Sequence, residues 1–147
     1  VEQGAEPSKL YHGLFNQMPF RAIKIIGAAL DKLELIELKP GLTLAYTYTL
    51  KEELTKLSAK DEDTDEIVDH IMRIKGIQGC LYLREAKQAG YFKGSLRSAI
   101  EGLDCSKIAS QINGGGHARA AGFNIDAGSM DELKATVIAI IMKQSNS

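Results

Sequence analysis

Strict alternation of side-chain character over residues 42–50 constrains the fold more than any other feature of this sequence. Leu42, Leu44, Tyr46 and Tyr48 would share one face of an extended chain, and the residues between them, Ala45 and threonines, would share the other. Successive side chains of a β-strand point to opposite faces of a sheet. The alternation therefore predicts a strand with one apolar face.

A second alternating stretch, residues 91–98, predicts a strand whose two faces differ in chemistry. Its apolar face carries Phe92, Gly94 and Leu96, and its polar face carries Lys93, Ser95 and Arg97. The first face suits a protein core. The second suits water or an anion, because it offers two cations and a hydroxyl group.

The remaining pattern places helices between strands. Further strands are predicted over residues 78–85 and 121–125, with a hairpin loop at 88–90. Apolar stripes at spacings of three and four predict helices over 22–33, 66–76, 104–112 and from 130 onward. Thr49 fits the N-cap of a short helix through Leu57, Asp104 fits another, and Ser129 with Glu132 fits a capping box for the last helix.

This order of elements predicts a single α/β domain: a mixed β-sheet of about four to five strands flanked by helices. We expect residues 1–19 to be a linker or the end of an upstream interdomain connection, and residues 20–147 to form the domain.

Composition and charge argue against several functions. The 147 residues carry a net charge of −1, which disfavours a broad electrostatic grip on duplex nucleic acid. No apolar run approaches the ~20 residues that span a membrane, and Val1 begins no signal-peptide pattern. Cys80 and Cys105 show no CxxC spacing and no pattern of a disulfide framework, and both lie among apolar residues. We therefore expect reduced thiols in a cytoplasmic protein. The sequence predicts no oligomeric state.

Three consecutive glycines, Gly114, Gly115 and Gly116, are followed by His117 and then Arg119. Glycines can present backbone N–H groups closely to a ligand, and N–H groups turned to one side form a concave anion site. The alternative is a flexible turn. The run follows a predicted helix and precedes a strand, so it is neither a Walker A loop nor a dinucleotide-binding turn.

Other side chains could complete a phosphate site. His117 could donate to a phosphate oxygen or act as a general acid, or it could only bond backbone. Arg97 could clamp phosphate through two nitrogens, with Ser95 and Ser98 as supporting hydroxyls, and Arg119 is a weaker candidate. For a lone arginine, a solvated strand residue is the simpler alternative.

The sequence predicts no metal site of its own. Asp69-His70 lies inside an amphipathic helix without a second ligand at matching spacing, so we interpret it as a solvated helix face. There is no Ser-His-Asp signature, and neither cysteine is flanked by a base.

These residues resemble a known family. Gly114–His117 with Ala120-Ala121-Gly122 is similar to the GGGHxxAAG signature of the DHHA1 domain, the C-terminal half of DHH-family phosphoesterases. The Ser95-Leu96-Arg97-Ser98 stretch resembles the S-x-R-S strand of that family, and residues 104–112 resemble its D-x-x-x-I-A helix.

The resemblance implies a substrate-binding half. The most similar branch comprises small oligoribonuclease and pAp-phosphatase proteins that hydrolyse short oligoribonucleotides, pAp or linear and cyclic dinucleotides with manganese. The Asp-His-His ligands of the DHH domain are missing here, so Mn²⁺ would belong to an upstream DHH domain, and this chain alone would be inactive. By resemblance, Gly114–His117 and Arg97 would hold the nucleotide phosphates. The alternative is a non-catalytic nucleic-acid-binding module, as in an exonuclease or alanyl-tRNA synthetase.

Overall fold

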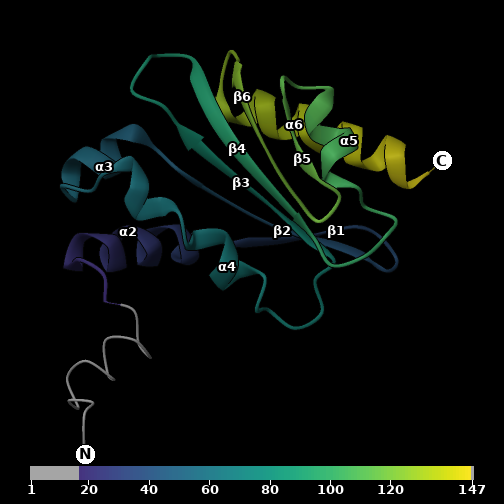
Figure 1. Cartoon of the computed structure of the whole chain (residues 1–147), viewed down its shortest axis with the longest axis horizontal. Helices are drawn as coiled ribbons and strands as arrows, with labels where there is room; N and C mark the ends of the chain where they lie inside the picture. The colour runs from purple at the N-terminus through teal and green to yellow at the C-terminus, as the bar shows by residue number, and fades with distance from the viewer. Residues whose placement is uncertain (1–16, 147) are drawn as a thin grey trace, which may run out of the picture.

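The computed structural model describes residues 17–146 (Figure 1). It contains six strands: β1 (Glu34–Lys39), β2 (Leu42–Thr49), β3 (Gly79–Glu85), β4 (Tyr91–Ser98), β5 (Gly114–His117) and β6 (Ala120–Asp126). The helices are α2 (Phe20–Asp31), α3 (Lys51–Lys56), the 3-10 helix η1 (Asp61–Thr64), α4 (Ile67–Ile71), α5 (Cys105–Ser110) and α6 (Met130–Ser145).

All six strands form one mixed sheet in the order β1-β2-β3-β4-β6-β5. Strands β2 and β3 are parallel, and the other neighbouring pairs are antiparallel. The predicted α/β class and flanking helices are confirmed, but the sheet has six strands and not the four to five expected. Both extra strands, β1 and β5, lie at the edges of the sheet, where burial imposes little alternation on the sequence.

Helices cover the two faces of the sheet unequally. Helices α5 and α6 pack on one face, over a core that includes Leu81, Leu96 and Phe123. Helices α2 and α4 pack on the other face, but only over β2 and β3, around Ala45 and Cys80. Figure 1 shows this separation of α2–α4 from α5 and α6. The second face of β4, β6 and β5 is therefore left without a helix among the described residues.

Hydrogen bonds confirm two of the three predicted helix caps. The Asp104 carboxylate accepts from the backbone N–H groups of Ser106 and Lys107, and the Ser129 hydroxyl accepts from that of Glu132. The Thr49 cap is wrong by one residue. Leu50 is the N-cap of α3, and the Thr49 hydroxyl accepts instead from the Tyr82 hydroxyl at 2.6 Å.

The segment formed by η1 and α4 is anchored to α2 through Asp63. The Asp63 carboxylate accepts from Arg21 Nε at 2.7 Å and from the Lys60 N–H at 2.7 Å. Burial alone would raise the pKa of Asp63, but these hydrogen bonds outweigh it and hold the pKa below its usual value. The segment thus forms a fixed wall beside β3.

Two sequence expectations concern the start of the chain and the helix before Gly76. Most of the expected linker, residues 1–16, lies outside the described residues. The helix expected over residues 66–76 is shorter than predicted: α4 ends at Ile71, turns follow it, and Gly76 has a φ of +90°. No helix in the described part of the chain is long and apolar enough to cross a membrane.

Candidate functional site

The uncovered face of β4, β6 and β5 gathers several of the predicted site residues into rows. Arg97 on β4 pairs with Ala120 on β6, which pairs with His117 on β5. In the next row, Ser95 pairs with Gly122, which pairs with Gly115. Adjacent strands lie about 4.8 Å apart, so the backbones at Arg97 and His117, at the two ends of this row, are roughly 10 Å from each other. We call this surface, formed by the face of β4, β6 and β5 opposite α5 and α6, the open face.

The three glycines of β5 have different roles. A Cβ at Gly116 would lie 2.7 Å from the Ala120 carbonyl oxygen, and its φ of +150° also favours glycine. A Cβ at Gly114 would overlap Gly122 and Phe123. A Cβ at Gly115, by contrast, would meet nothing within 4 Å. Packing therefore explains Gly114 and Gly116, whereas Gly115 leaves bare backbone on the open face.

The glycine run is an extended edge strand and not the concave turn that the sequence suggested. Its N–H groups alternate in direction, because β5 pairs with β6 through every second residue. As the last strand in the order of the sheet, β5 directs the other N–H groups away from the sheet, where they can bind a ligand or water.

Polar side chains on the open face have few protein partners within the described part of the chain. Arg97 is 31% exposed in its side chain and makes one long contact, 3.9 Å from Asp69, which is itself 70% exposed. Within residues 17–146, the side chains of Ser95 and His117 make no hydrogen bond or ion pair. Buried or half-buried polar groups are normally hydrogen-bonded, so the half-buried Ser95 and Arg97 suit a ligand.

Ser98 and Arg119 are not part of these rows. Ser98 points to the other face of the sheet, where it is buried and its hydroxyl donates to the Ile100 carbonyl at 2.7 Å. Arg119 is exposed in the turn between β5 and β6, and its carbonyl accepts from the Ser98 N–H. The structure thus brings together Arg97, Ser95, Gly115 and His117, while Arg119 lies at the tip of the hairpin.

A small polar hollow of about 130 Å³ adjoins the open face, between the η1–α4 wall and strands β3 and β4. Its cationic lining residues are Arg84, Lys93 and Arg97. Arg84 was not identified from the sequence. The alternation of Tyr82 and Arg84 could have placed it, since Arg84 pairs with Lys93 and shares its face of the sheet.

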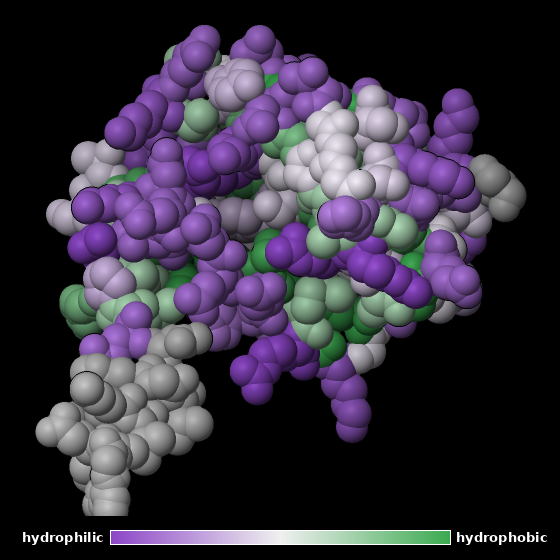
Figure 2. All heavy atoms as spheres, viewed as in Figure 1, coloured by the Kyte–Doolittle hydropathy of each residue, from purple (hydrophilic) through white to green (hydrophobic). Residues whose placement is uncertain are grey.

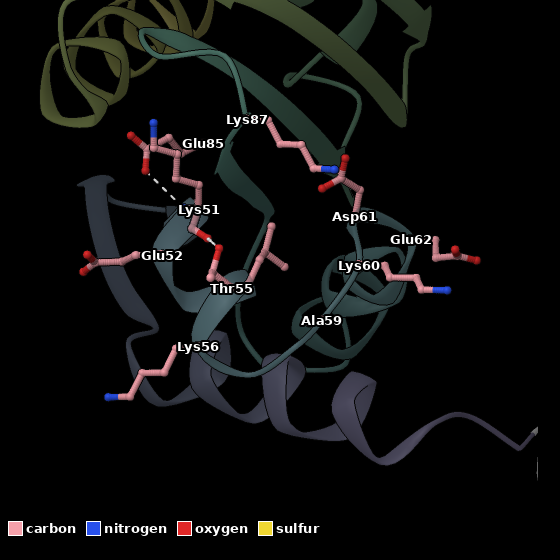
Figure 3. A pocket seen from close by; sticks show the side chains of 11 residues that line it. Lys51, Glu52, Thr55, Lys56, Ala59, Lys60, Asp61, Glu62, Glu85 and Lys87 are labelled. Carbon is pink, nitrogen blue, oxygen red and sulfur yellow. Dashed lines mark hydrogen bonds between the residues drawn. The ribbon is translucent and has the colours of Figure 1, made fainter.

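A larger hollow, about 1030 Å³, lies elsewhere, between α3, η1 and the end of β3. Figure 3 shows its lining side chains, with Lys87 directed toward Asp61 and with Lys56 and Glu52 pointing outward. None of the predicted site residues lines it, and its four lysines are matched by four carboxylates. It therefore offers no excess of positive charge to attract a phosphate.

Other chemistries find less support in the described residues. No three His, Cys, Asp or Glu side chains between residues 17 and 146 are grouped so that they could hold a metal ion. Cys80 and Cys105 are free and buried, as expected. Burial raises the pKa of Cys80 to about 12 and that of Cys105 to about 11, so neither is a thiolate nucleophile at neutral pH.

The large hydrophobic side chains that the described chain exposes do not belong to the strands of the open face. Figure 2 shows mostly hydrophilic side chains in this view, with hydrophobic ones mainly toward the lower half. The exposed large hydrophobic side chains of the described chain, Phe20, Ile23 and Leu35, belong to α2 and β1. Strand β1 is at the opposite edge of the sheet from β5.

Residues 41–143 match the family model of the DHHA1 domain. The chain belongs to the DHHA1 family. The match spans the whole open face and the η1–α4 wall, and it confirms the resemblance at the level of the domain. The search of curated proteins gave no match.

Solved structures share the fold of this DHHA1 domain. An exopolyphosphatase-related protein from Bacteroides fragilis is 23% identical, with a TM-score of 0.79 over 97% of this chain and 40% of its own. A pGpG-specific phosphodiesterase from Vibrio cholerae is 13% identical, with a TM-score of 0.50 over 92% of this chain and 40% of its own. The C-Ala domain of Aquifex aeolicus alanyl-tRNA synthetase is 14% identical, with a TM-score of 0.53 over 74% of this chain and 98% of its own.

The chain therefore spans about 40% of the length of the first two structures. At these identities the likeness establishes the shared fold.

Alanine substitutions in β5 distinguish a glycine that packing requires from one that packing does not require. We expect Gly115→Ala to leave the free energy of unfolding within about 0.5 kcal/mol of wild type, because its Cβ meets open space. Gly116→Ala should cost about 1–3 kcal/mol, because its Cβ would overlap β6 and its φ is unfavourable. Urea denaturation measures both. Equal losses would contradict the distinction between them.

Proposed function

We propose that the open face binds the phosphate groups of a short oligoribonucleotide, of pAp or of a linear or cyclic dinucleotide. The observation that carries the proposal is the row of Arg97, Ala120 and His117 beside the bare backbone of Gly115. The guanidinium of Arg97 and the imidazole of His117 flank a floor made of small residues, and a phosphate can approach that floor closely. Charged donors to phosphate are among the stronger hydrogen bonds that proteins form.

Each residue has a separate role in this proposal. Arg97 donates from its guanidinium to phosphate, and Ser95 adds a hydroxyl from the same strand. Gly115 and its neighbours present the edge of β5, and His117 donates to a phosphate oxygen or serves as a general acid. Arg119 adds positive charge at the hairpin tip. Ser98 acts indirectly, because its hydrogen bonds shape the end of β4.

The chemistry itself is assigned to the parent protein. We propose a DHH-family phosphoesterase in the cytoplasm whose DHH domain holds manganese, while this chain orients the substrate and neutralises its charge. The residues described here do not fit a manganese site. We therefore expect this chain alone to hydrolyse nothing, and a general-acid role of His117 would require the DHH domain of the parent protein.

The C-Ala likeness favours one other function, a non-catalytic nucleic-acid-binding module. Such a module would grip many phosphates along a polynucleotide. The net charge of −1 and the extent of the open face, three strands wide, fit a short ligand better.

Titration of the chain with pApA and with a 20-nucleotide single strand tests the two functions. For the short ligand we expect saturable binding with a shallow dependence on salt, because few counterions are released. The long strand should bind no more tightly per site. A steep salt dependence with a strong preference for the long strand would support the nucleic-acid-binding module instead.

A further inference from the structure

A separate hollow, which we call the α6 hollow, lies where the N-terminus of α6 meets β1 and β2. Tyr46 of β2 lines it and belongs to the core that α5 and α6 cover, so the hollow is on the face of the sheet opposite the open face. Its volume is about 340 Å³, in the range of cavities that hold small molecules. None of the residues assigned above to phosphate binding lines it.

The Tyr46 hydroxyl is buried at this hollow without a protein partner. Tyr46 is 4% exposed, and its hydroxyl makes no hydrogen bond to any residue between 17 and 146. Burial, and then the nearby charges of Asp131 and Glu34, raise the pKa of Tyr46 above its ordinary value, so the hydroxyl keeps its proton and can donate. Both carboxylates line the hollow, which places the hydroxyl beside it. Because buried polar groups are normally hydrogen-bonded, this donor calls for an acceptor from a ligand.

The first turn of α6 adds two further donors. The Ser129 hydroxyl accepts from the Glu132 N–H, but the N–H groups of Met130 and Asp131 have no acceptor among the described residues. The helix is 16 residues long, and the partial positive charge at its N-terminus favours a negatively charged group. The helix end and the Tyr46 hydroxyl are thus two independent sets of donors at one hollow.

The charged side chains around the hollow leave one carboxylate without an ion pair. Lys32 forms an ion pair with Glu53, and Lys134 forms one with Glu34 at 3.0 Å. Asp131 is exposed at the hollow and makes no ion pair within the described part of the chain. A ligand therefore meets unpartnered N–H and O–H donors next to one unpaired negative charge.

This combination favours a ligand that carries both charges. A lone phosphate would be repelled by the carboxylates of Glu34 and Asp131, and a lone cation would be repelled by the two lysines and the helix N-terminus. A zwitterion avoids both penalties. Its anionic group can accept from the donors at the end of α6, and its cationic group can lie against Asp131.

Apolar side chains form the rest of the lining, notably Leu50, Met130 and the ring of Tyr48. The Lys32 ammonium lies 4.2 Å from the centroid of the Tyr48 ring, and the ring of Tyr46 stacks on it at 6.0 Å. Tyr48 is therefore not an open platform on which a nucleobase could stack. The volume corresponds to roughly eleven water molecules, which is enough for one amino acid.

We propose that the α6 hollow binds a free α-amino acid with an apolar side chain. The ligand carboxylate accepts from the Tyr46 hydroxyl and from the N–H groups of Met130 and Asp131. Its ammonium group pairs with the Asp131 carboxylate, and its side chain packs against Leu50 and Met130. The site is independent of the proposed phosphate binding, because it lies on the other face of the sheet.

Calorimetric titration of the chain with L-leucine and with L-phenylalanine tests the proposal. We expect at least one of them to bind at one site per chain with a Kd of about 1 mM or lower. The N-acetyl derivative of that amino acid lacks the ammonium charge, and its amide lacks the carboxylate. Each should bind at least about 10-fold more weakly, because a charge-assisted contact is lost. The amide also represents the N-terminus of a peptide, so the titration distinguishes a free amino acid from a peptide end.

Two variants test the contacts. Tyr46→Phe removes only the hydroxyl and should weaken binding by about 10-fold. It should leave the midpoint of urea denaturation unchanged or raise it, because a buried hydroxyl without a protein partner contributes no stability. Asp131→Asn keeps the size of an exposed side chain but removes its charge, and it should weaken binding to a similar extent.

Tyr91→Phe on β4 is the matched control, since it removes a hydroxyl outside the α6 hollow, and it should preserve the affinity. The inference is overturned if neither amino acid binds, or if the blocked derivatives bind as tightly as the free amino acid. Wild-type affinity in both Tyr46→Phe and Asp131→Asn would also overturn it. A lower urea midpoint in Tyr46→Phe would do the same, because the hydroxyl would then have a partner within the protein.

Discussion

Phe123→Ala should lower the free energy of unfolding by about 3–5 kcal/mol, the largest effect expected for any single substitution considered in this chain. Phe123 is 2% exposed, and its ring occupies the space above Gly94, where a Cβ would overlap it. The pair lies directly opposite across β4 and β6. Truncation would leave a cavity at a position where the neighbouring strand has no side chain to fill it.

Thermal and urea denaturation measure this loss, which corresponds to a melting temperature lower by about 10 °C or more. The matched control is Phe20→Ala, because Phe20 is 77% exposed, and it should change stability by less than about 0.5 kcal/mol. Phe123→Leu should lose only part of the energy. Similar losses for Phe123→Ala and Phe20→Ala would show that the ring does not hold β4 and β6 together.

The same pair illustrates what alternation could predict. The pattern of residues 91–98 placed Gly94 on the core face and Lys93, Ser95 and Arg97 on the other, and the burial along β4 confirms both faces. That a phenylalanine from β6 would cover Gly94 could not be predicted, because cross-strand register depends on where distant strands pair.

The two edge strands were missed for a related reason. Strand β1 exposes Leu35, and its pairing with β2 is irregular between Glu37 and Lys39. Strand β5 has no side chain before His117, so it carries no hydrophobic pattern at all. At sheet edges, pairing with the neighbouring strand determines the structure, and periodicity gives little signal.

The candidate site was only partly predictable from sequence. Arg97, Ser95, Gly115 and His117 were named from the motif, and the structure brings them to one surface. The hollow lined by Arg84 could not be predicted, because one of its sides is formed by the η1–α4 wall. The position of that wall beside β3 depends on tertiary contacts of Asp63 with α2. Local sequence patterns cannot reveal contacts between residues that are this far apart along the chain.

Arg97→Ala should weaken binding of pApA by roughly 10- to 100-fold. Hydrogen bonds to charged groups contribute about 1.5–3 kcal/mol, and a factor of ten corresponds to about 1.4 kcal/mol. The fold should tolerate the change, because the one ion pair of Arg97, with Asp69 at 3.9 Å, is long and exposed to water. Calorimetric titration measures the affinity, and urea denaturation checks that stability changes by less than about 1 kcal/mol.

Two further variants identify the physical cause of the loss. Arg97→Lys retains the charge but not the planar pair of donors, so it should recover only part of the affinity if phosphate is held through two nitrogens. Lys107→Ala removes one positive charge from the opposite side of the sheet and should leave the affinity within about twofold. Full recovery in Arg97→Lys would reduce the role of Arg97 to a point charge. An equal loss in Lys107→Ala would mean that net charge, and not the geometry of β4, β6 and β5, governs binding.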